Sequence, residues 1–395
     1  MYPTIKDLFK SVVPLSGEQK KKISHLSEYV DQETLKKAEY LLKTNKINMI
    51  FSRYGVTAKL FEDIIYPELK LNTKDDKVKT FVSNINKEVQ EKVKKRSFKK
   101  FSEVAQDKIK EYISPNIYGL DYVKRAAMLQ LFSSDPVHVL LLGDPGTGKT
   151  DILRSVSDLH PITSFGLGSG TSGAGLGVTI KGKEVVKGLL PRANNGICCI
   201  DELNLMKRED YAYLYSAMEK GFITYSKATK HEVFDTKVRI LATANPKGDK
   251  FVGKMVSTLK KQLPFDQALL SRFHLVFLIR KPDIEGFIHI TKKIVDGHKI
   301  QVNKKDLKFI QEYVNYAESI DVEFPKDYRE EVVDFIEALK RREKEFLIEM
   351  SPRIVIGLVR LCKAHARMNL RTKVNTQDLG VVKDLVKNTL VLREK

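Results

Sequence analysis

The turn GDPGTGKT at residues 143–150 has the residue types and spacing of a phosphate-binding loop. It matches the pattern G-x-x-x-x-G-K-[ST] and lies between an apolar run and a helical pattern, which is the context this chemistry needs. Glycines let the backbone fold around phosphate oxygens and point its N–H groups inward. The helix that follows adds its positive N-terminal end. The turn therefore predicts a binding site for a nucleoside triphosphate.

Two residues of this loop have predicted contacts of their own, and the others are expected to surround the nucleotide. We expect Lys149 to reach the β- and γ-phosphates, and Thr150 to hold Mg²⁺ with its hydroxyl. The residues that we expect to surround the nucleotide are Gly143, Asp144, Pro145, Gly146, Thr147, Gly148, Lys149 and Thr150.

A pair of carboxylates follows on another apolar run, GICCIDELN. Asp201 and Glu202 would emerge at the carboxyl edge of a parallel sheet, where such folds bind their ligands. Asp201 is suited to holding the water shell of Mg²⁺, and Glu202 to orienting and polarising the attacking water. A further run, VRILATANP, ends in Asn245, whose amide could position the same water. The alternative is a turn-forming Asn before Pro246.

The elements that must position these residues alternate along the middle of the chain. Short apolar runs are separated by helical patterns, and the runs lie at 137–142, 161–165, 196–201, 238–244 and 274–279. Continuous apolar strands between helices argue for a parallel sheet that is buried on both faces. After Pro282 the pattern is helical to the end, and NTQD (375–378) is typical of a helix N-terminus. The predicted class is therefore α/β, a P-loop NTPase with a helical lid and a mostly helical N-terminal region.

Composition limits the class of protein. The hydrophobic fraction of 42% and charged fraction of 30% are typical of a soluble globular protein. We expect no membrane-spanning helix, because no apolar run reaches 18 residues. The start, MYPTIKDLFK, lacks the charged and apolar regions of a secretion signal, so we expect a cytoplasmic location. The net charge of +19 would attract polyanions such as nucleic acid. A lysine-rich composition with a solvated surface is the alternative.

The cysteines are too few for a four-ligand structural zinc site. Cys198, Cys199 and Cys362 all lie in apolar runs. We expect them to be small core residues, and we expect no zinc.

Taken together, these residues resemble the AAA+ ATPases and, within them, the MCM family of replicative DNA helicases. The resemblance covers about 113 to 388, and its segments keep the order of the family: ISPNIYGLDYVKRAAMLQLF, GDPGTGKT, GSGTSGAGL, GICCIDELN, AMEKGFITYSKATK, ATANP, LLSRFHLVF and SPRIVIGLVRLCKAHARM. It implies a five-stranded parallel sheet sandwiched by helices, and ATP with Mg²⁺ as cofactors. It also implies a homo-oligomeric ring that holds single-stranded DNA in a central channel, in association with the nucleoid.

The resemblance adds four site residues. Arg272, in SRF, resembles the arginine finger of the family and would reach ATP held by a neighbouring subunit. Arg353, in SPR, resembles the sensor-2 position and would contact phosphate, also in trans. Tyr118 and Gly119 look like the segment on the adenine side. Considered alone, either arginine could be an ordinary surface or salt-bridge residue.

Two lysine-bearing segments resemble the DNA-contacting hairpins of the family. FITYSKATKHEVFD predicts a hairpin by its alternation alone, and Lys227 and Lys230 would lie at its tip. TSGAGLGVTIKGKEVVKGLL resembles the insert in helix 2, whose turn carries Lys181 and Lys183. Phosphate contacts of this kind hold a strand without reading its sequence. A charged tip that meets only solvent is the alternative.

The chain also departs from the family pattern. Only about 112 residues precede the ATPase, without zinc cysteines, and the chain ends soon after the lid, so we expect no winged helix. His274 follows SRF where the family usually has Asp. We expect a basic N-terminal region at 1–112, an AAA+ core at 113–282 and a helical lid at 283–395.

Three classes of function are compatible with these patterns. The first is an ATP-hydrolysing, replication-related motor acting on DNA as a helicase or translocase. The stretch GLLPRANNGICCIDELNLM also leans toward magnesium-chelatase and MoxR-like relatives, so the second is a protein-remodelling ATPase. The third is a non-catalytic, DNA-binding remnant of an MCM protein.

Overall fold

The computed structural model describes residues 91, 94–181, 184–227, 230–248, 250–282, 284–295 and 302–390. The chain forms two compact units, Met1–Phe101 and Ser102–Lys395. Most of the region predicted to be helical at 1–112 lies outside the described residues, although its last segment, α7 (Ala105–Tyr112), is a helix. The predicted boundaries at 112 and 282 stay predictions.

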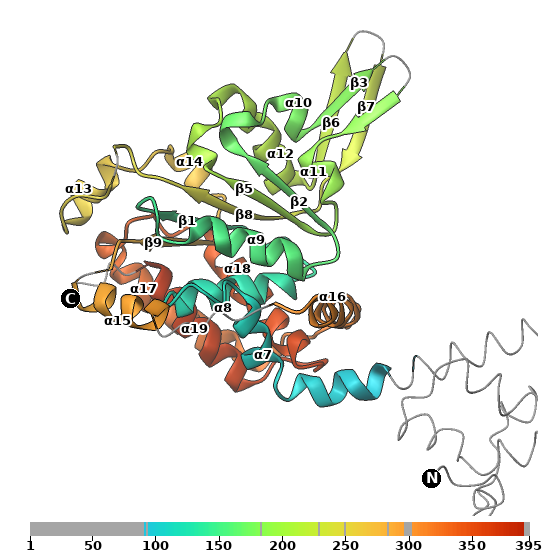
Figure 1. Ribbon diagram of the computed structural model, residues 1–395, viewed down its shortest axis with the longest axis vertical. Coiled ribbons are helices and arrows are strands. Elements are labelled where there is room, and N and C mark those ends of the chain that lie inside the picture. Colours follow the sequence, from blue (N-terminus) through green and yellow to red (C-terminus); the bar gives the residue numbers. More distant parts are fainter. Residues whose placement is uncertain are drawn as a thin grey trace, which may run out of the picture. The chain divides into compact units, whose positions relative to one another are not determined.

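A five-stranded parallel sheet forms the centre of the unit Ser102–Lys395 (Figure 1). Its strands lie in the order β2-β5-β8-β1-β9, and each neighbouring pair is parallel. The strands are β1 (Val139–Gly143), β2 (Thr163–Leu167), β5 (Ile197–Asp201), β8 (Arg239–Ala244) and β9 (Leu275–Ile279). Each of the five predicted apolar runs is one of these strands, so the predicted α/β fold is confirmed.

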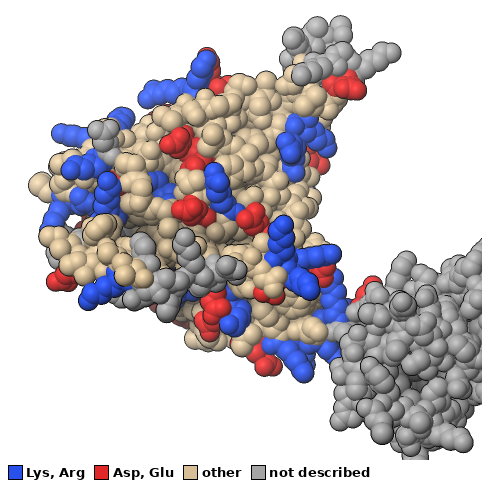
Figure 2. Space-filling model, viewed as in Figure 1, with Lys and Arg blue, Asp and Glu red and all other residues tan. Residues whose placement is uncertain are grey.

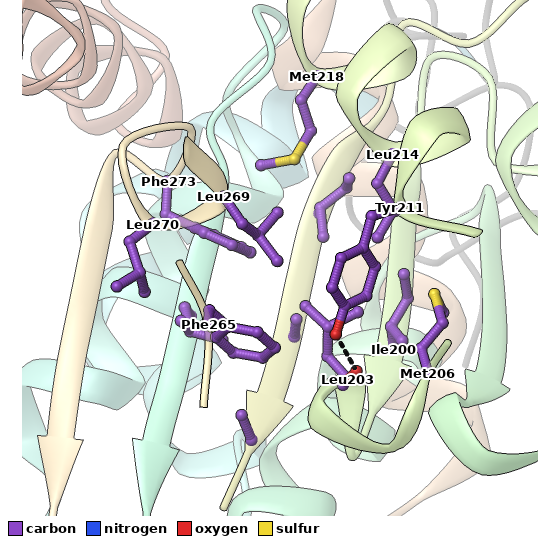
Figure 3. Packing of buried hydrophobic residues seen from close by; sticks show 14 of the residues in the cluster. Ile200, Leu203, Met206, Tyr211, Leu214, Met218, Phe265, Leu269, Leu270 and Phe273 are labelled. Atoms are coloured by element: carbon purple, nitrogen blue, oxygen red, sulfur yellow. Dashed lines mark hydrogen bonds between the residues drawn. The ribbon is translucent and has the colours of Figure 1, made fainter. Parts of the chain in front are cut away.

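Helices cover both faces of this sheet, which explains why its strands are mostly apolar. On one face pack α8 (Asp121–Leu131) and α9 (Lys149–Leu159). On the other face, α12 (Tyr211–Lys220) and α14 (Gln267–Leu270) contribute to one apolar cluster. Figure 3 shows this cluster, in which Tyr211 also donates a hydrogen bond to the Leu203 carbonyl, 3.3 Å away. Burial on both faces is what a parallel sheet requires.

The remaining elements are short segments around the sheet and a helical lid. The short ones are η3 (Gly168–Gly170), α10 (Gly173–Leu176), α11 (Leu189–Arg192), η4 (Leu203–Leu205), η5 (Arg208–Asp210) and α13 (Val256–Lys261). The helical part after β9 comprises α15 (Ile284–Val295), α16 (Lys304–Glu318), η6 (Lys326–Tyr328), α17 (Arg329–Arg341), η7 (Glu343–Glu345), α18 (Pro352–Met368) and α19 (Thr376–Leu390). None of the described helices is long and apolar enough to cross a membrane.

Two helix starts in the lid are visible in the sequence. Pro352 is the first residue of α18, where a missing N–H and a fixed φ are tolerated. Asn375 precedes α19, and its side-chain oxygen accepts from the N–H of Asp378 at 3.0 Å. The Asp378 carboxylate accepts from the Asn375 N–H at 2.8 Å, which completes a reciprocal cap. The helix N-terminus predicted at NTQD is therefore confirmed.

The three cysteines are buried core residues, as predicted. Cys198 and Cys199 lie in β5, and Cys362 lies in α18. Burial raises the pKa of the Cys198 thiol to about 11. These thiols are therefore protonated at neutral pH and belong to the packing rather than to chemistry.

A buried ion pair joins the sheet to the lid. Arg239, at the start of β8, pairs with Glu318 at the end of α16. The Arg239 guanidinium also donates to the Ser133 carbonyl at 2.8 Å. His160 Nε2 lies 2.8 Å from Arg239 Nη2. Burial lowers the pKa of both Arg239 and His160. The buried guanidinium is thus kept charged by its close partners.

Arg239→Met tests this link between the sheet and the lid. The substitution leaves Glu318 in a largely buried position without its cation, so we expect the free energy of unfolding to fall by about 3–5 kcal/mol. Urea unfolding of the full chain, followed by circular dichroism, measures it. Arg341→Met is the control, because the Arg341–Glu337 pair is exposed. Equal stability of the two variants would show that the buried pair contributes nothing.

Candidate active site

The phosphate-loop motif forms the turn between β1 and α9, as predicted. Gly148 immediately precedes α9 and has φ 81°, a conformation that residues with a side chain rarely adopt. A Cβ atom at Gly148 would also lie 2.8 Å from Cδ1 of Ile117. The glycine is therefore required by its backbone conformation and by the segment that packs against it.

Lys149 is buried at the first turn of α9. Its Nζ donates to the carbonyls of Gly143 at 2.9 Å and Asp144 at 2.6 Å. Burial lowers the pKa of Lys149 to about 8, although the carboxylates of Asp144, Asp201 and Glu202 oppose the shift. The ammonium is mainly protonated at neutral pH, and a phosphate beside it would favour the charged form further.

Asp201 links the loop to the neighbouring strands. The Thr150 hydroxyl donates to Asp201 Oδ2 at 2.9 Å, and the Thr243 hydroxyl donates to Asp201 Oδ1 at 2.5 Å. Thr243 was not among the predicted site residues, although it is the polar residue within the apolar run RILATA. Hydroxyl and carboxylate oxygens are the ligands that Mg²⁺ prefers, so Thr150 and Asp201 fit the predicted metal site.

Glu202 follows β5 with a backbone that two contacts restrain. Its φ of 53° lies in the left-handed region, where non-glycine residues are uncommon, and its N–H donates to the Thr243 hydroxyl at 2.8 Å. Gly168 of η3 approaches so closely that a Cβ atom there would lie 2.1 Å from the Glu202 carbonyl oxygen. The carboxylate predicted to orient water is thus carried by a tightly fixed backbone.

Asn245 and Asp144 are also held at this edge of the sheet. Asn245 follows β8, which lies between β5 and β1, and its N–H donates to the Asn204 side chain at 3.0 Å. The Asp144 carboxylate accepts from the N–H groups of Phe251 at 2.8 Å and Lys281 at 3.2 Å. The Asp144 side chain therefore ties the loop to two other segments, while its backbone remains part of the predicted phosphate cradle.

The predicted adenine-side segment lies against the loop. Ile117 contacts Gly148, and Tyr118 and Gly119 follow it, Gly119 with φ 75°. Lys124, from α8, donates to the carbonyls of Ile117 at 2.6 Å and Ser114 at 2.9 Å. This lysine fixes the segment, and it was not predicted because a basic residue on a helix carries no such signal.

The two arginines predicted to act in trans lie near each other. Arg272 follows α14, and Arg353 lies in the first turn of α18. The pKa of Arg353 is lowered, first by burial and then by the positive charge of Arg272, while Glu219 opposes the shift. Arg272 Nη2 is 3.0 Å from Glu219 Oε2. The structure thus pairs Arg272 with Glu219, and the charges of both groups act on Arg353.

His274, which replaces the usual Asp of the family, is a buried neutral residue. Its Nδ1 accepts from the N–H of His138 at 3.0 Å, and burial lowers its pKa to about 2. A Cβ atom at Gly357 of α18 would lie 2.9 Å from the His274 Cβ atom. His274 therefore packs between β1 and the helix that carries Arg353.

Two antiparallel hairpins extend beyond the sheet in the same direction (Figure 1). The first pairs β3 (Val178–Lys181) with β4 (Glu184–Lys187), and the second pairs β6 (Phe222–Lys227) with β7 (Lys230–Asp235). The hairpin predicted from FITYSKATKHEVFD is thus confirmed. Lys183 and the side chains of the other three predicted lysines, Lys181, Lys227 and Lys230, lie outside the described residues, so their contact with DNA stays a prediction.

Comparison with known proteins decides the family. The model of the MCM P-loop domain matches residues 94–298, and the model of the MCM AAA-lid domain matches residues 308–390. The chain belongs to the MCM family. It is therefore an AAA+ P-loop ATPase by descent, and the predicted resemblance is confirmed.

The similar proteins include archaeal and eukaryotic members of the MCM family. The chain is 27% identical to a minichromosome maintenance protein MCM of Saccharolobus solfataricus, over 69% of this chain and 43% of that protein. It is 27% identical to the maternal DNA replication licensing factor mcm6 of Xenopus tropicalis (75% and 40%) and 29% identical to the DNA replication licensing factor mcm4 of Schizosaccharomyces pombe (72% and 35%). The chain spans less than half the length of these relatives.

Gly168→Ala tests whether the backbone of Glu202 must stay where it is. The new Cβ atom would displace Glu202, and a shift of about 1 Å costs on the order of 100-fold in turnover. We expect kcat for ATP to fall to that extent with little change in nucleotide affinity, measured by steady-state ATPase and by nucleotide binding.

The matched control is Gly170→Ala in the same 3₁₀ segment, because no atom lies within 4 Å of a Cβ atom at Gly170. Turnover in Gly168→Ala equal to that of the control would mean that the Glu202 position is not critical.

Proposed function

We propose that this chain is the subunit of a ring-shaped motor that hydrolyses ATP and moves single-stranded DNA. The observation that carries the proposal is that the phosphate loop, the Thr150–Asp201 pair, Glu202 and Asn245 meet at one edge of the sheet in a chain of the MCM family. Relatives whose names refer to DNA replication support a replication-related substrate and an association with the DNA of the cell.

The ATP site follows from the groups at this edge. The loop N–H groups and Lys149 would bind the triphosphate, and Thr150 and Asp201 would hold Mg²⁺, which neutralises phosphate charge when it is bound. Glu202 would accept a hydrogen bond from the attacking water and polarise it, and Asn245 would help to orient that water. Family membership supports these roles, and each of them can be tested separately.

A neighbouring subunit would complete the site. Arg272 is paired with Glu219, and its positive charge acts on Arg353. Both arginines would reach the γ-phosphate held by the next copy of the chain. Catalysis would then occur only at the contact between two copies. This is the reason for proposing a homo-oligomeric ring.

The hairpin tips are the proposed contacts to DNA. Figure 2 shows basic and acidic side chains interspersed on the face in view, so the net charge does not by itself locate a binding surface there. Lysines in both hairpins would contact phosphates of a strand in a central channel. Such contacts hold any sequence, as a motor requires.

Turnover in the presence of single-stranded DNA distinguishes the proposed motor from the other two functions. We expect DNA to increase ATP turnover, and the increase to weaken steeply from 50 to 200 mM salt because counterions are released on binding. Steady-state ATPase assays over a salt series measure this. Turnover indifferent to DNA would favour a protein-remodelling ATPase, and DNA binding without turnover would favour a non-catalytic remnant.

Mixing two inactive variants tests the contribution of a neighbour. The Glu202→Gln chain keeps the arginine finger, Arg272, but should not hydrolyse ATP at its own site. The Arg272→Ala chain keeps an intact ATP site but lacks the finger. We expect each alone to lose at least about 100-fold in kcat, and a mixture to regain turnover at sites that combine them. A mixture as inactive as its components would exclude action of Arg272 in trans.

A further inference from the structure

Helix α12 holds the side chain of Arg272. Arg272 Nη2 lies 3.0 Å from Glu219 Oε2, and its Cζ atom lies 4.4 Å from the centre of the Tyr215 ring. Nη1 donates to the Ala268 carbonyl at 2.6 Å, one helical turn earlier. These hydrogen bonds use two of the five N–H donors of the guanidinium, so donors remain for a phosphate.

Tyr215 and Glu219 are spaced i, i+4, so they lie on one face of α12. Other residues of the helix, Leu214, Ala217 and Met218, are buried in the apolar cluster of the sheet. Figure 3 shows Leu214 and Met218 among the packed side chains of this cluster. The helix is therefore anchored on its buried side, and it presents a fixed ring and carboxylate to Arg272.

The same helix leads directly into the hairpin of β6 and β7. Gly221 ends α12 in the left-handed conformation, and its carbonyl accepts from the N–H of Thr236 at 2.8 Å, at the end of the returning strand. The Ser216 hydroxyl donates to the Phe222 carbonyl at 2.8 Å. Both strands of the hairpin are thus hydrogen-bonded to the last turns of α12.

We propose that Tyr215 and Glu219 are positioning residues for the arginine finger, and that α12 transmits the state of the hairpin to Arg272. DNA held by the hairpin of one subunit would then determine the orientation of Arg272, which enters the ATP site of the neighbouring subunit. The inference rests on the proposed function, because it assumes a finger that acts in trans and a hairpin that contacts DNA.

The charges around Glu219 support positioning rather than a role in stability. The Glu219 side chain is 54% exposed, and an ion pair so open to water contributes little to folding. Arg272 lies close enough to Arg353 to lower its pKa, and Glu219 acts in the opposite direction. Without this carboxylate the two cations would repel each other, and the finger would lose its orientation.

The test places Glu219→Gln in one chosen chain of a mixed ring. The finger donor is the Glu202→Gln chain, and the ATP-site donor is the Arg272→Ala chain. We expect Glu219→Gln in the finger donor to lower the recovered kcat about tenfold, with KM for ATP unchanged, because only the orientation of the finger is altered. The same substitution in the ATP-site donor should have no effect.

Two further variants make the test specific. Lys220→Gln, at the exposed neighbour of Glu219, is the control and should leave the recovered turnover unchanged in either chain. Tyr215→Leu in the finger donor should lower turnover as Glu219→Gln does, whereas Tyr215→Phe, which keeps the ring, should not.

Each outcome has one meaning. Equal losses from Glu219→Gln in both chains would indicate a general structural defect, and unchanged or faster turnover would also overturn the positioning role. If the parent mixture of the Glu202→Gln and Arg272→Ala chains fails to regain activity, the trans finger on which the inference rests is excluded instead.

The same mixtures test the role of the hairpin. We expect DNA to stimulate ATP turnover by the parent mixture, and we expect this stimulation to be lost when the finger donor carries Glu219→Gln. Retained stimulation would overturn transmission through α12, and a parent mixture indifferent to DNA would remove the proposed DNA contact.

Discussion

The parallel pairing of β1, β5 and β8 is the constraint on which the rest of the structure depends. Because these strands run in one direction, the residues that follow them emerge at the same edge of the sheet. The hydrogen bond from Thr150 to Asp201 spans this edge and joins the phosphate loop to the end of β5. Thr243, near the end of β8, completes the connection through the second oxygen of Asp201. The candidate ATP site is a direct consequence of strand direction.

The lid and the sheet are joined by buried polar groups, which limits how the arginines can be arranged. Arg239 and Glu318 connect the opposite edge of the sheet to α16. Within the lid, the fully buried Asp378 accepts from Arg371 at 2.7 Å and pairs with His365, whose Nε2 lies 3.0 Å from Gln106 of α7. Such groups are stable only when every partner is present, so they favour one arrangement of helices. Arg353 is therefore carried on a helix with a defined position.

The groups of the candidate ATP site and the arginine finger thus lie on separate elements of one subunit. The groups that would bind and hydrolyse ATP follow β1, β5 and β8, whereas Arg272 is held by α12, the helix that leads into a hairpin. Under the proposed function, a subunit of this design would respond to DNA at its hairpin and act on a nucleotide held by its neighbour. The proposed coupling would have a short route, because α12 contacts both Arg272 and the base of the hairpin.

The sequence by itself determined the phosphate loop, the five strands, the hairpin of β6 and β7 and the start of α19. These features depend on local spacing, turn residues and the period of apolar positions, which can be recognised in a short segment. The approximate place of Glu202 and Asn245 followed as well, because residues after parallel strands meet at one edge.

Only the tertiary structure decided which side chains support these groups. Thr243 bonds to Asp201 across 42 positions of the chain, and Arg272 bonds to Glu219 across 53. Gly168 lies against the carbonyl of Glu202, although no pattern in GSGTSG indicates that neighbour. Such contacts arise from strand order and helix packing, in which many weak interactions over the whole chain choose the partner of each residue. The residue types near a position along the chain do not contain that information.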